Sequence, residues 1–236
     1  MRIQFWSVAA YMAAALPAAV TQAATTVEWT VVGSMTPSSC AMQLGDGGKV
    51  NIGTVSSATV RTWLAAPDFP DSYYKSSIRQ LMLTVDCPSP TKMALSFVDN
   101  RSATVLQPLS TTSFGLGRHV FSGMVSNIGE YQVSMNGLQI RTSTGSTLMS
   151  PAVRLLANGV ANSGSVWARA TGDADIHIQP SKSLGFAANS GASAPDFLMN
   201  IVGPLDFSIL LHRPVVNGAT TDINLDGAAT VTLTII

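Results

Sequence analysis

The sequence predicts an all-β protein built as a sandwich or barrel. Thr, Val, Ile and Leu dominate short apolar runs, and Gly, Pro, Asn or Ser separates these runs at short intervals. No stretch has the pattern of a long helix. The predicted strands are residues 27–35, 49–55, 79–87, 92–98, 129–140, 166–171, 174–178, 200–212 and 223–236.

The N-terminus has the pattern of an export signal. Met1 and Arg2 form a short positive region, residues 5–16 are apolar, and Thr21-Gln22-Ala23 offers small residues at the positions that a signal peptidase reads. We predict a signal peptide over 1–23 and a mature chain that begins at Ala24. The alternative is an N-terminal membrane anchor, for which the apolar stretch is short.

We expect residues 24–236 to form a single domain with long loops. The most linker-like stretch, residues 187–195, is followed by only about forty residues, which are too few for a second domain without a staple of its own. No later stretch approaches the roughly 18 consecutive apolar residues of a spanning helix, so we expect no membrane span in the mature chain.

The composition excludes nucleic acid as a partner. The chain carries 13 Lys and Arg against 13 Asp and Glu, and only 11% of its residues are charged. Such a chain has no electrostatic reason to bind nucleic acid or an anionic membrane surface.

Both cysteines, Cys40 and Cys87, lie in the exported part. An even count in an oxidising compartment predicts one disulfide, which would stabilise the fold by about 4 kcal/mol on the chain-entropy model. Neither cysteine has a second one at metal-ligand spacing, and a catalytic thiol would leave its partner unexplained.

The C-terminus ends in an alternating strand. Ala229, Val231, Leu233 and Ile235 fall on one face, and mostly Thr falls on the other. Chain ends fray unless a sheet ties them down, so this strand needs a partner, either in this chain or in another one.

Catalytic and metal-binding motifs are weak. Residues 222–227 match the first half of a calcium loop, but Leu233 stands where the pattern needs a bidentate Glu. A polar turn that leads into the last strand accounts for them better. Asp173 and Asp175 are a similarly weak metal pair, and the histidines are scattered. We therefore expect no enzyme activity, no metal and no cofactor.

An aromatic cluster, Trp63, Phe69, Tyr73 and Tyr74, falls in a Pro- and Asp-rich loop. We expect these side chains to cap one end of the sandwich; the alternative is a ligand loop with stacking platforms for sugars. Residues 99–101, Asp-Asn-Arg, follow a predicted strand, and we expect them to form a turn held by side-chain hydrogen bonds.

Two sets of residues carry a resemblance to known families. The strand leading into Cys40, the return of Cys87 at the end of another strand and the alternating C-terminal strand resemble periplasmic pilus subunits. More specifically, residues 87–95, 98–101, 114–117 and 128–131 resemble a family of uncharacterised fimbria-related exported proteins. That family is the domain of unknown function 1120, found in bacteria near chaperone–usher operons, and the resemblance covers nearly the whole mature chain.

The resemblance implies an immunoglobulin-like β-sandwich of pilus-subunit type that lacks its final strand. A periplasmic chaperone, and later another pilus subunit at the usher, would supply that strand by β-augmentation. The groove that receives it would be lined by Ala229, Val231, Leu233 and Ile235. The implied location is the periplasm and then the fimbrium, where the protein would act in adhesion, with a host or surface receptor as a further partner.

Three departures from the pilus pattern qualify this expectation. Ile235 stands where an aromatic is usual and Ile223 where Gly is usual. Only residues 24–26 precede the first predicted strand, so we expect the chain to accept a strand rather than to donate one. The alternative function is a self-complete secreted sandwich, paired on both edges of its last strand, that binds carbohydrate or another surface ligand.

Overall fold

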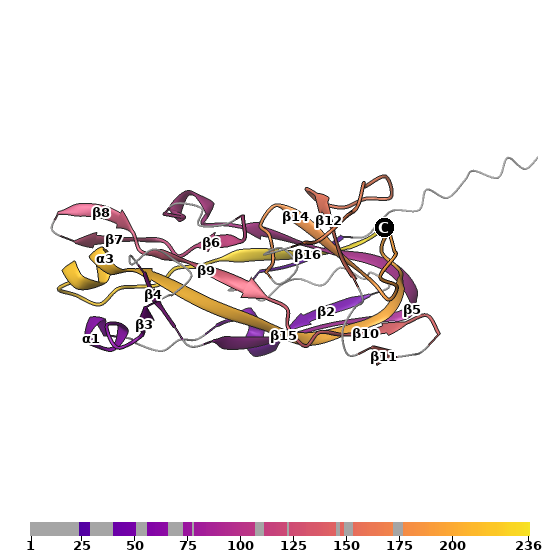
Figure 1. Cartoon of the computed structure of the whole chain (residues 1–236), viewed down its shortest axis with the longest axis horizontal. Helices are drawn as coiled ribbons and strands as arrows, with labels where there is room; N and C mark the ends of the chain where they lie inside the picture. The colour runs from indigo at the N-terminus through magenta and orange to yellow at the C-terminus, as the bar shows by residue number, and fades with distance from the viewer. Residues whose placement is uncertain are drawn as a thin grey trace, which may run out of the picture.

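The computed structural model of the chain describes residues 24–28, 40–50, 56–65, 73–76, 78–106, 111–121, 123–144, 147–148, 153–171 and 177–236. Within these ranges the chain is mostly β-strand (Figure 1).

The strands are β1 (Ala24–Glu28), β2 (Ala41–Leu44), β3 (Leu64–Ala65), β4 (Tyr73–Lys75), β5 (Arg79–Asp99), β6 (Ser113–Gly115), β7 (Arg118–Phe121), β8 (Met124–Asn127), β9 (Gly129–Ser134), β10 (Gln139–Thr142), β11 (Thr147–Leu148), β12 (Val153–Asn158), β13 (Ala168–Arg169), β14 (Lys182–Ala187), β15 (Phe197–His212) and β16 (Ala229–Ile235). The short helices are η1 (Gly45–Gly48), α1 (Ser57–Val60), η2 (Ser102–Thr104) and α3 (Arg213–Gly218).

Two antiparallel layers face each other across the core. One layer contains β2, the first part of β5, β15, β10 and β11, with β9, β6, β4 and β3 alongside. The other contains β1, β16, the second part of β5, β14, β12 and β13. Because β5 passes from one layer to the other, the strands of both layers form one continuous curled sheet, and β7 and β8 pair as a separate two-stranded sheet. The prediction of an all-β sandwich is confirmed.

The long strand β5 was expected as two strands, 79–87 and 92–98. In the structure it runs through the Cys-Pro-Ser-Pro stretch that was expected to separate them. Residues 87–90 lie opposite the register shift between Leu198 and Asn200 of β15, so the two prolines fall where the ladder is interrupted. The bend is therefore the point where the chain changes layer.

Apolar side chains from both layers fill the space between them. The most buried include Leu83, Val85, Leu95, Phe97, Phe186, Ile201 and Val231, all at 0–1% exposure. They come from strands distant in sequence and form a single main cluster.

Several predicted strand limits differ from the observed ones. The stretch 129–140 divides into β9 and β10 at a turn where Gly137 has φ +74°, a conformation that favours glycine. Residues 223–228 precede β16 without joining a strand, and Lys49 and Val50 are outside any strand. Residues 29–35, 51–55 and 174–176 of the predicted strands lie outside the described residues.

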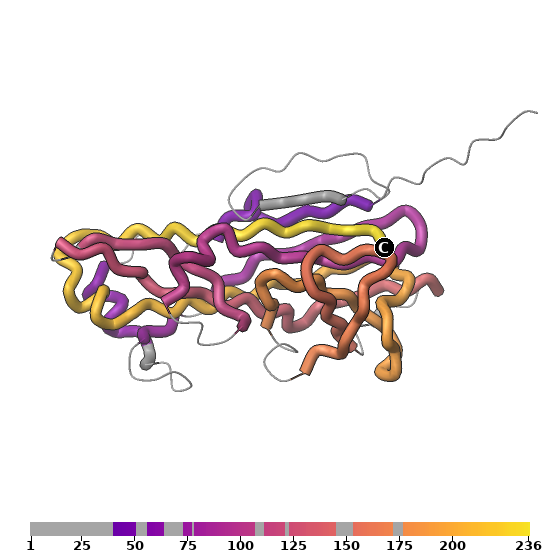
Figure 2. The backbone as a smooth tube through the Cα atoms, turned by 90° about the horizontal axis from the view of Figure 1, so that it is seen from above, coloured from indigo at the N-terminus to yellow at the C-terminus, as the bar shows by residue number. Residues whose placement is uncertain are grey.

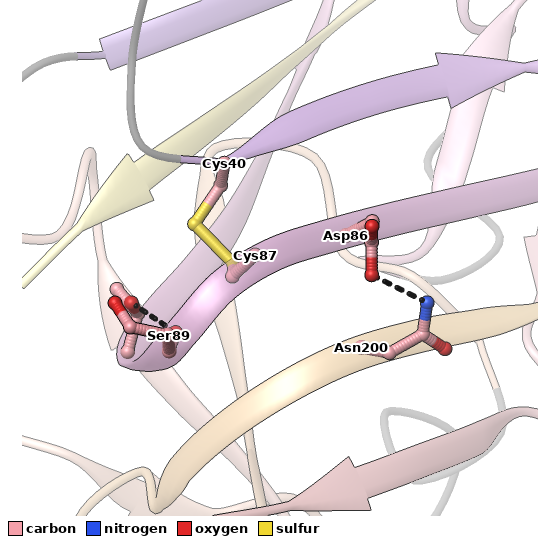
Figure 3. Close-up of a disulfide and its surroundings, with 6 residues drawn as sticks. Cys40, Asp86, Cys87, Ser89 and Asn200 are labelled. Atoms are coloured by element: carbon pink, nitrogen blue, oxygen red, sulfur yellow. Dashed lines mark hydrogen bonds between the residues drawn. A yellow bond between two sulfur atoms is a disulfide. The ribbon is translucent and has the colours of Figure 1, made fainter.

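The predicted disulfide is present. Cys40 and Cys87 are bonded with a Cα–Cα distance of 4.2 Å, and both are buried. Figure 3 shows the bond joining the start of β2 to β5 just before its bend, next to Asp86, which accepts a hydrogen bond from Asn200 Nδ2 at 3.4 Å. The staple thus lies where β5 leaves the first layer.

Candidate functional site

The C-terminal strand β16 has a buried and a polar face. Ala229, Val231 and Leu233 are fully buried in the main core, and Ile235 packs against the same core while half-buried. Thr232, on the other face, is half-exposed. The structure therefore gathers the four predicted groove residues on one inner face.

β16 has a neighbour on each edge. On one side its seven residues pair antiparallel with β5, from Ala229 opposite Asp99 to Ile235 opposite Met93 (Figure 2). On the other side Thr230–Thr234 pair antiparallel with β1, and Val27 lies opposite Val231. The C-terminal strand thus lies between two strands of its own chain.

The strand β1 begins at Ala24, the residue predicted to start the mature chain. The sequence predicted a first strand from residue 27, so the three residues expected to precede that strand belong to it. β1 also contacts β2, the strand that begins beside the disulfide. The N-terminal segment therefore occupies the place next to β16 where the resemblance implied a strand from another protein.

A set of polar contacts lies at the end of β5, next to the segment that precedes β16. The carboxylate of Asp99 is buried; its Oδ1 accepts from the Arg101 amide and its Oδ2 from the Gly115 amide, both at 2.8 Å. Burial raises the pKa of Asp99, and these two hydrogen bonds and the Arg101 charge oppose the rise. The predicted turn held by side-chain bonds is observed at 99–101.

Arg101 extends these contacts to the segment before β16. Its Nε donates to Asp226 Oδ2 at 2.9 Å and its Nη2 donates to Asp226 Oδ1 at 3.1 Å. The Asp226 amide in turn donates to the Leu116 carbonyl at 3.0 Å. We call Asp99, Arg101, Gly115 and Asp226 the polar clamp.

The two glycines of the 114–117 block are required by close packing. A Cβ on Gly115 would lie 2.2 Å from the Arg101 carbonyl oxygen. Gly117 has φ +92° and donates from its amide to Thr104 Oγ1 at 3.0 Å. The sequence blocks 98–101 and 114–117 are thus parts of one interlocked structure.

Residues 222–227, which match the first half of a calcium loop, lie before β16. In the described part of the chain, no group of three His, Cys, Asp or Glu side chains could hold a metal ion. Asp226 is bound by Arg101, and Asp222 is exposed on the segment before β16. Asp173 and Asp175 lie outside the described residues.

The aromatic cluster lies near one end of the sandwich and packs inward where it is described. Trp63 packs against the main core while half-buried, and Tyr73 is buried against Leu210. Tyr74 packs against the main core, with the Arg213 guanidinium 5.0 Å from its ring centroid. These contacts match the expected capping role. Phe69 lies outside the described residues, and the ligand loop stays a prediction.

A buried carboxyl that the sequence did not single out lies on β9. Glu130 is 0% exposed; its Oε1 accepts from Ser113 Oγ at 3.0 Å, and its Oε2 has no hydrogen-bond partner among the described residues. Burial raises the pKa of Glu130 to about 7, while the Ser113 bond lowers it. Burial, and secondly Glu130, raise the pKa of Tyr73 to about 12. Periodicity alone could not find Glu130, because the alternation in β9 assigns it to a polar face, whereas the structure buries all six residues of this strand.

The hairpin of β7 and β8 exposes apolar side chains at the end of the molecule farthest from the C-terminus (Figure 1). Val120, Met124 and Val125 are at least 60% exposed. Val120 and Val125 lie opposite each other in the ladder, so they share one face. Among the described residues, no helix is long and apolar enough to cross a membrane.

The chain is thus an all-β sandwich with one disulfide and a C-terminal strand that is paired on both edges. Residues 29–139 match the family described as "Protein of unknown function (DUF1120)", so a domain of this family is found in the chain. None of the curated proteins compared with the chain matches it. The matched range contains Asp99, Arg101 and Gly115 of the polar clamp but not Asp226. It ends before β15 and β16, the partners of β5.

Proposed function

We propose that the protein is a fimbrial or pilus-type subunit, or a tip adhesin, whose sandwich takes up a strand from another protein along β16. A periplasmic chaperone supplies this strand first, and another subunit replaces it at the usher. The observation that carries the proposal is the pairing of β16: one edge is bound along its whole length by β5, whereas the other is covered only by the N-terminal strand β1.

β1 has the properties of a replaceable strand. It is five residues long, lies at the start of the predicted mature chain, and pairs in the described structure with β16 alone. Terminal strands open more readily than strands held on both edges, and an element exchanged between copies is a low-cost route to assembly. Removal of β1 would leave the N–H and C=O groups of that β16 edge unpaired, which favours strand addition.

The buried face of β16 supplies specificity for an incoming strand. Val231 and Leu233 alternate with Thr232, so every second position of the strand contributes to the apolar core. An added strand with the same period places its own apolar residues against this core. Export follows from the predicted signal peptide, and the disulfide agrees with an oxidising compartment.

A deletion of residues 24–28 tests the proposal. The shortened chain, co-expressed with a cognate pilus chaperone, should be recovered as a complex, and it should aggregate without the chaperone. The intact chain is the matched control and should bind the chaperone more weakly, because β1 competes for the same edge. A shortened chain that stays a soluble monomer and binds no chaperone would falsify the proposal.

One observation favours the alternative of a self-complete secreted sandwich. β1 and β5 already satisfy both edges of β16 within this chain, as a protein that folds alone requires. Such a protein would bind carbohydrate or another surface ligand through its loops. An intact chain that is monomeric, ignores the chaperone and binds a glycan would support this function over strand exchange.

A further inference from the structure

The alternation of β16 does not by itself define its register on β5. A slip of one residue would turn Val231 and Leu233 outward, so the buried face excludes it. A slip of two residues keeps the same alternation, although Val or Gly then takes the place of Ala229 and Leu or Ala takes the place of Val231. It moves the strand by about 7 Å and leaves the pattern almost unchanged. The alternation alone therefore does not select the observed register; side-chain size in the core and the contacts around the start of the strand do so.

We infer that the polar clamp, together with Gly227, sets the register of β16, and thereby determines which of its residues face an incoming strand. Its consequence for an incoming strand rests on the proposed function, whereas the contacts that set the register lie within this chain. Arg101 contacts Asp226 through two hydrogen bonds of 2.9 and 3.1 Å, three residues before β16 begins. The Asn100 amide donates to the Ala228 carbonyl at 3.0 Å in the same place.

A two-residue slip in either direction breaks the pair with Arg101. In one direction Ala228 takes the position of Asp226, and in the other direction Asn224 takes it. Neither side chain carries the charge that a bidentate guanidinium contact needs. Both partners are partly exposed, at 39% and 63%, so the pair contributes little to overall stability. Its effect lies in adding a preference for the observed register to the one that side-chain size in the core supplies.

Gly227 supplies a second, steric selection. A Cβ at this position would lie 2.9 Å from Tyr131 Cε1 and 3.2 Å from Leu116 Cδ2. The two slips would bring Ala229 or Leu225 to this place, and each has a Cβ. A Cβ at this place would therefore clash with the buried ring of Tyr131 in the same two slips that break the Arg101–Asp226 contact.

Cross-linking in the full chain measures the register directly. The pair Val98→Cys with Thr230→Cys reports the observed register, because these residues lie opposite each other. The pair Val98→Cys with Thr232→Cys reports the slip that brings Thr232 opposite Val98. In the observed register these two residues are offset by two positions, so their Cα atoms lie beyond disulfide reach. Mild oxidation followed by peptide mapping separates either bond from the native Cys40–Cys87 bond.

Arg101→Ala should raise the yield of the slip reporter relative to the register reporter by up to about fivefold, the ratio expected for loss of an exposed ion pair. Asp226→Asn should act in the same direction, and it serves if Arg101→Ala does not fold. Arg101→Asp combined with Asp226→Arg should restore the original ratio. The matched control is Lys182→Ala, which removes an exposed 2.8 Å contact with Asn158 away from β16.

Equal ratios in the unmodified background, both clamp variants and the control would overturn the inference. So would a raised slip yield that the charge-reversed pair fails to correct, because a general loss of stability would then explain it. Neither measurement needs a chaperone. A negative result here can therefore be told apart from failure of strand exchange, which the deletion of residues 24–28 tests separately.

Discussion

Asp99 Oδ2 accepts a hydrogen bond of 2.8 Å from the backbone amide of Gly115, and both residues are buried. This contact joins the end of β5 to β6 and brings together two sequence blocks that carry the family resemblance. The blocks are therefore a structural unit, and the residues around it can be tested one at a time.

Gly115→Ala should destabilise the protein by roughly 3 kcal/mol, because the added Cβ would lie 2.2 Å from the backbone oxygen of Arg101. Urea unfolding followed by circular dichroism measures the change in the free energy of unfolding. Gly191→Ala is the control, since its Cβ would meet only Asn189 Oδ1 at 3.5 Å. Equal stability of the two variants would show that Gly115 is not a packing constraint.

The buried carboxyl of Glu130 should make stability fall as the pH rises. Its folded-state pKa is about 7 and its unfolded-state pKa is near 4.5, so the folded state binds more protons between these values. The contribution is fully present below pH 4.5, decreases up to pH 7 and is constant above it.

Glu130→Gln should therefore flatten the change in unfolding free energy between pH 5 and 7 and stabilise the protein by roughly 2–3 kcal/mol at pH 8. Urea titrations at several pH values test this. Asp222→Asn, at an exposed position, is the control and should keep the slope of the unmodified protein. An unchanged slope in Glu130→Gln would assign the pH dependence to other groups.

Loss of the disulfide should cost about 4 kcal/mol on the chain-entropy model, because Cys40 and Cys87 close a loop with a sequence separation of 47. The variant with both cysteines replaced by Ala should match the unmodified protein measured under reducing conditions. Thermal unfolding with and without reductant provides the comparison. If the midpoint does not move on reduction, the covalent link contributes little to this fold.

Leu233→Asp should abolish capture by a pilus chaperone, because it places a charge on the fully buried face of β16. Thr232→Asp changes a half-exposed position on the other face of the same strand and should retain capture. Co-purification of each variant with the chaperone measures the difference. Normal capture of Leu233→Asp would remove this face of β16 from the proposed groove.

Local patterns predicted much of the fold. The alternation over residues 229–235 indicated one buried face, and the burial of Val231 and Leu233 agrees with it. The prolines of β5 misled the prediction, since Pro usually ends a strand and here marks the passage of one strand between layers. The short strands of the β7–β8 hairpin were missed because their sequence is too brief to show a period.

The candidate site, too, was predicted only in part. The four residues of the β16 face were named from the sequence, but their neighbour β1 was not expected there. The sequence predicted that the aromatic side chains cap one end of the sandwich, and the inward packing of Tyr73 and Tyr74 agrees with this prediction. Glu130 had no recognisable pattern, since its burial depends on strands from distant parts of the chain.

By itself, the sequence determined the all-β class, the disulfide and the two faces of the last strand, because these depend on residue type and on a period of two along a single segment. Only the tertiary structure decided that β1 lies beside β16 and that Arg101 meets Asp226, 125 residues away. Such contacts depend on how the layers fold over each other. The alternation of β16 is compatible with more than one register, and the side chains around Asp226 and Gly227 distinguish between them.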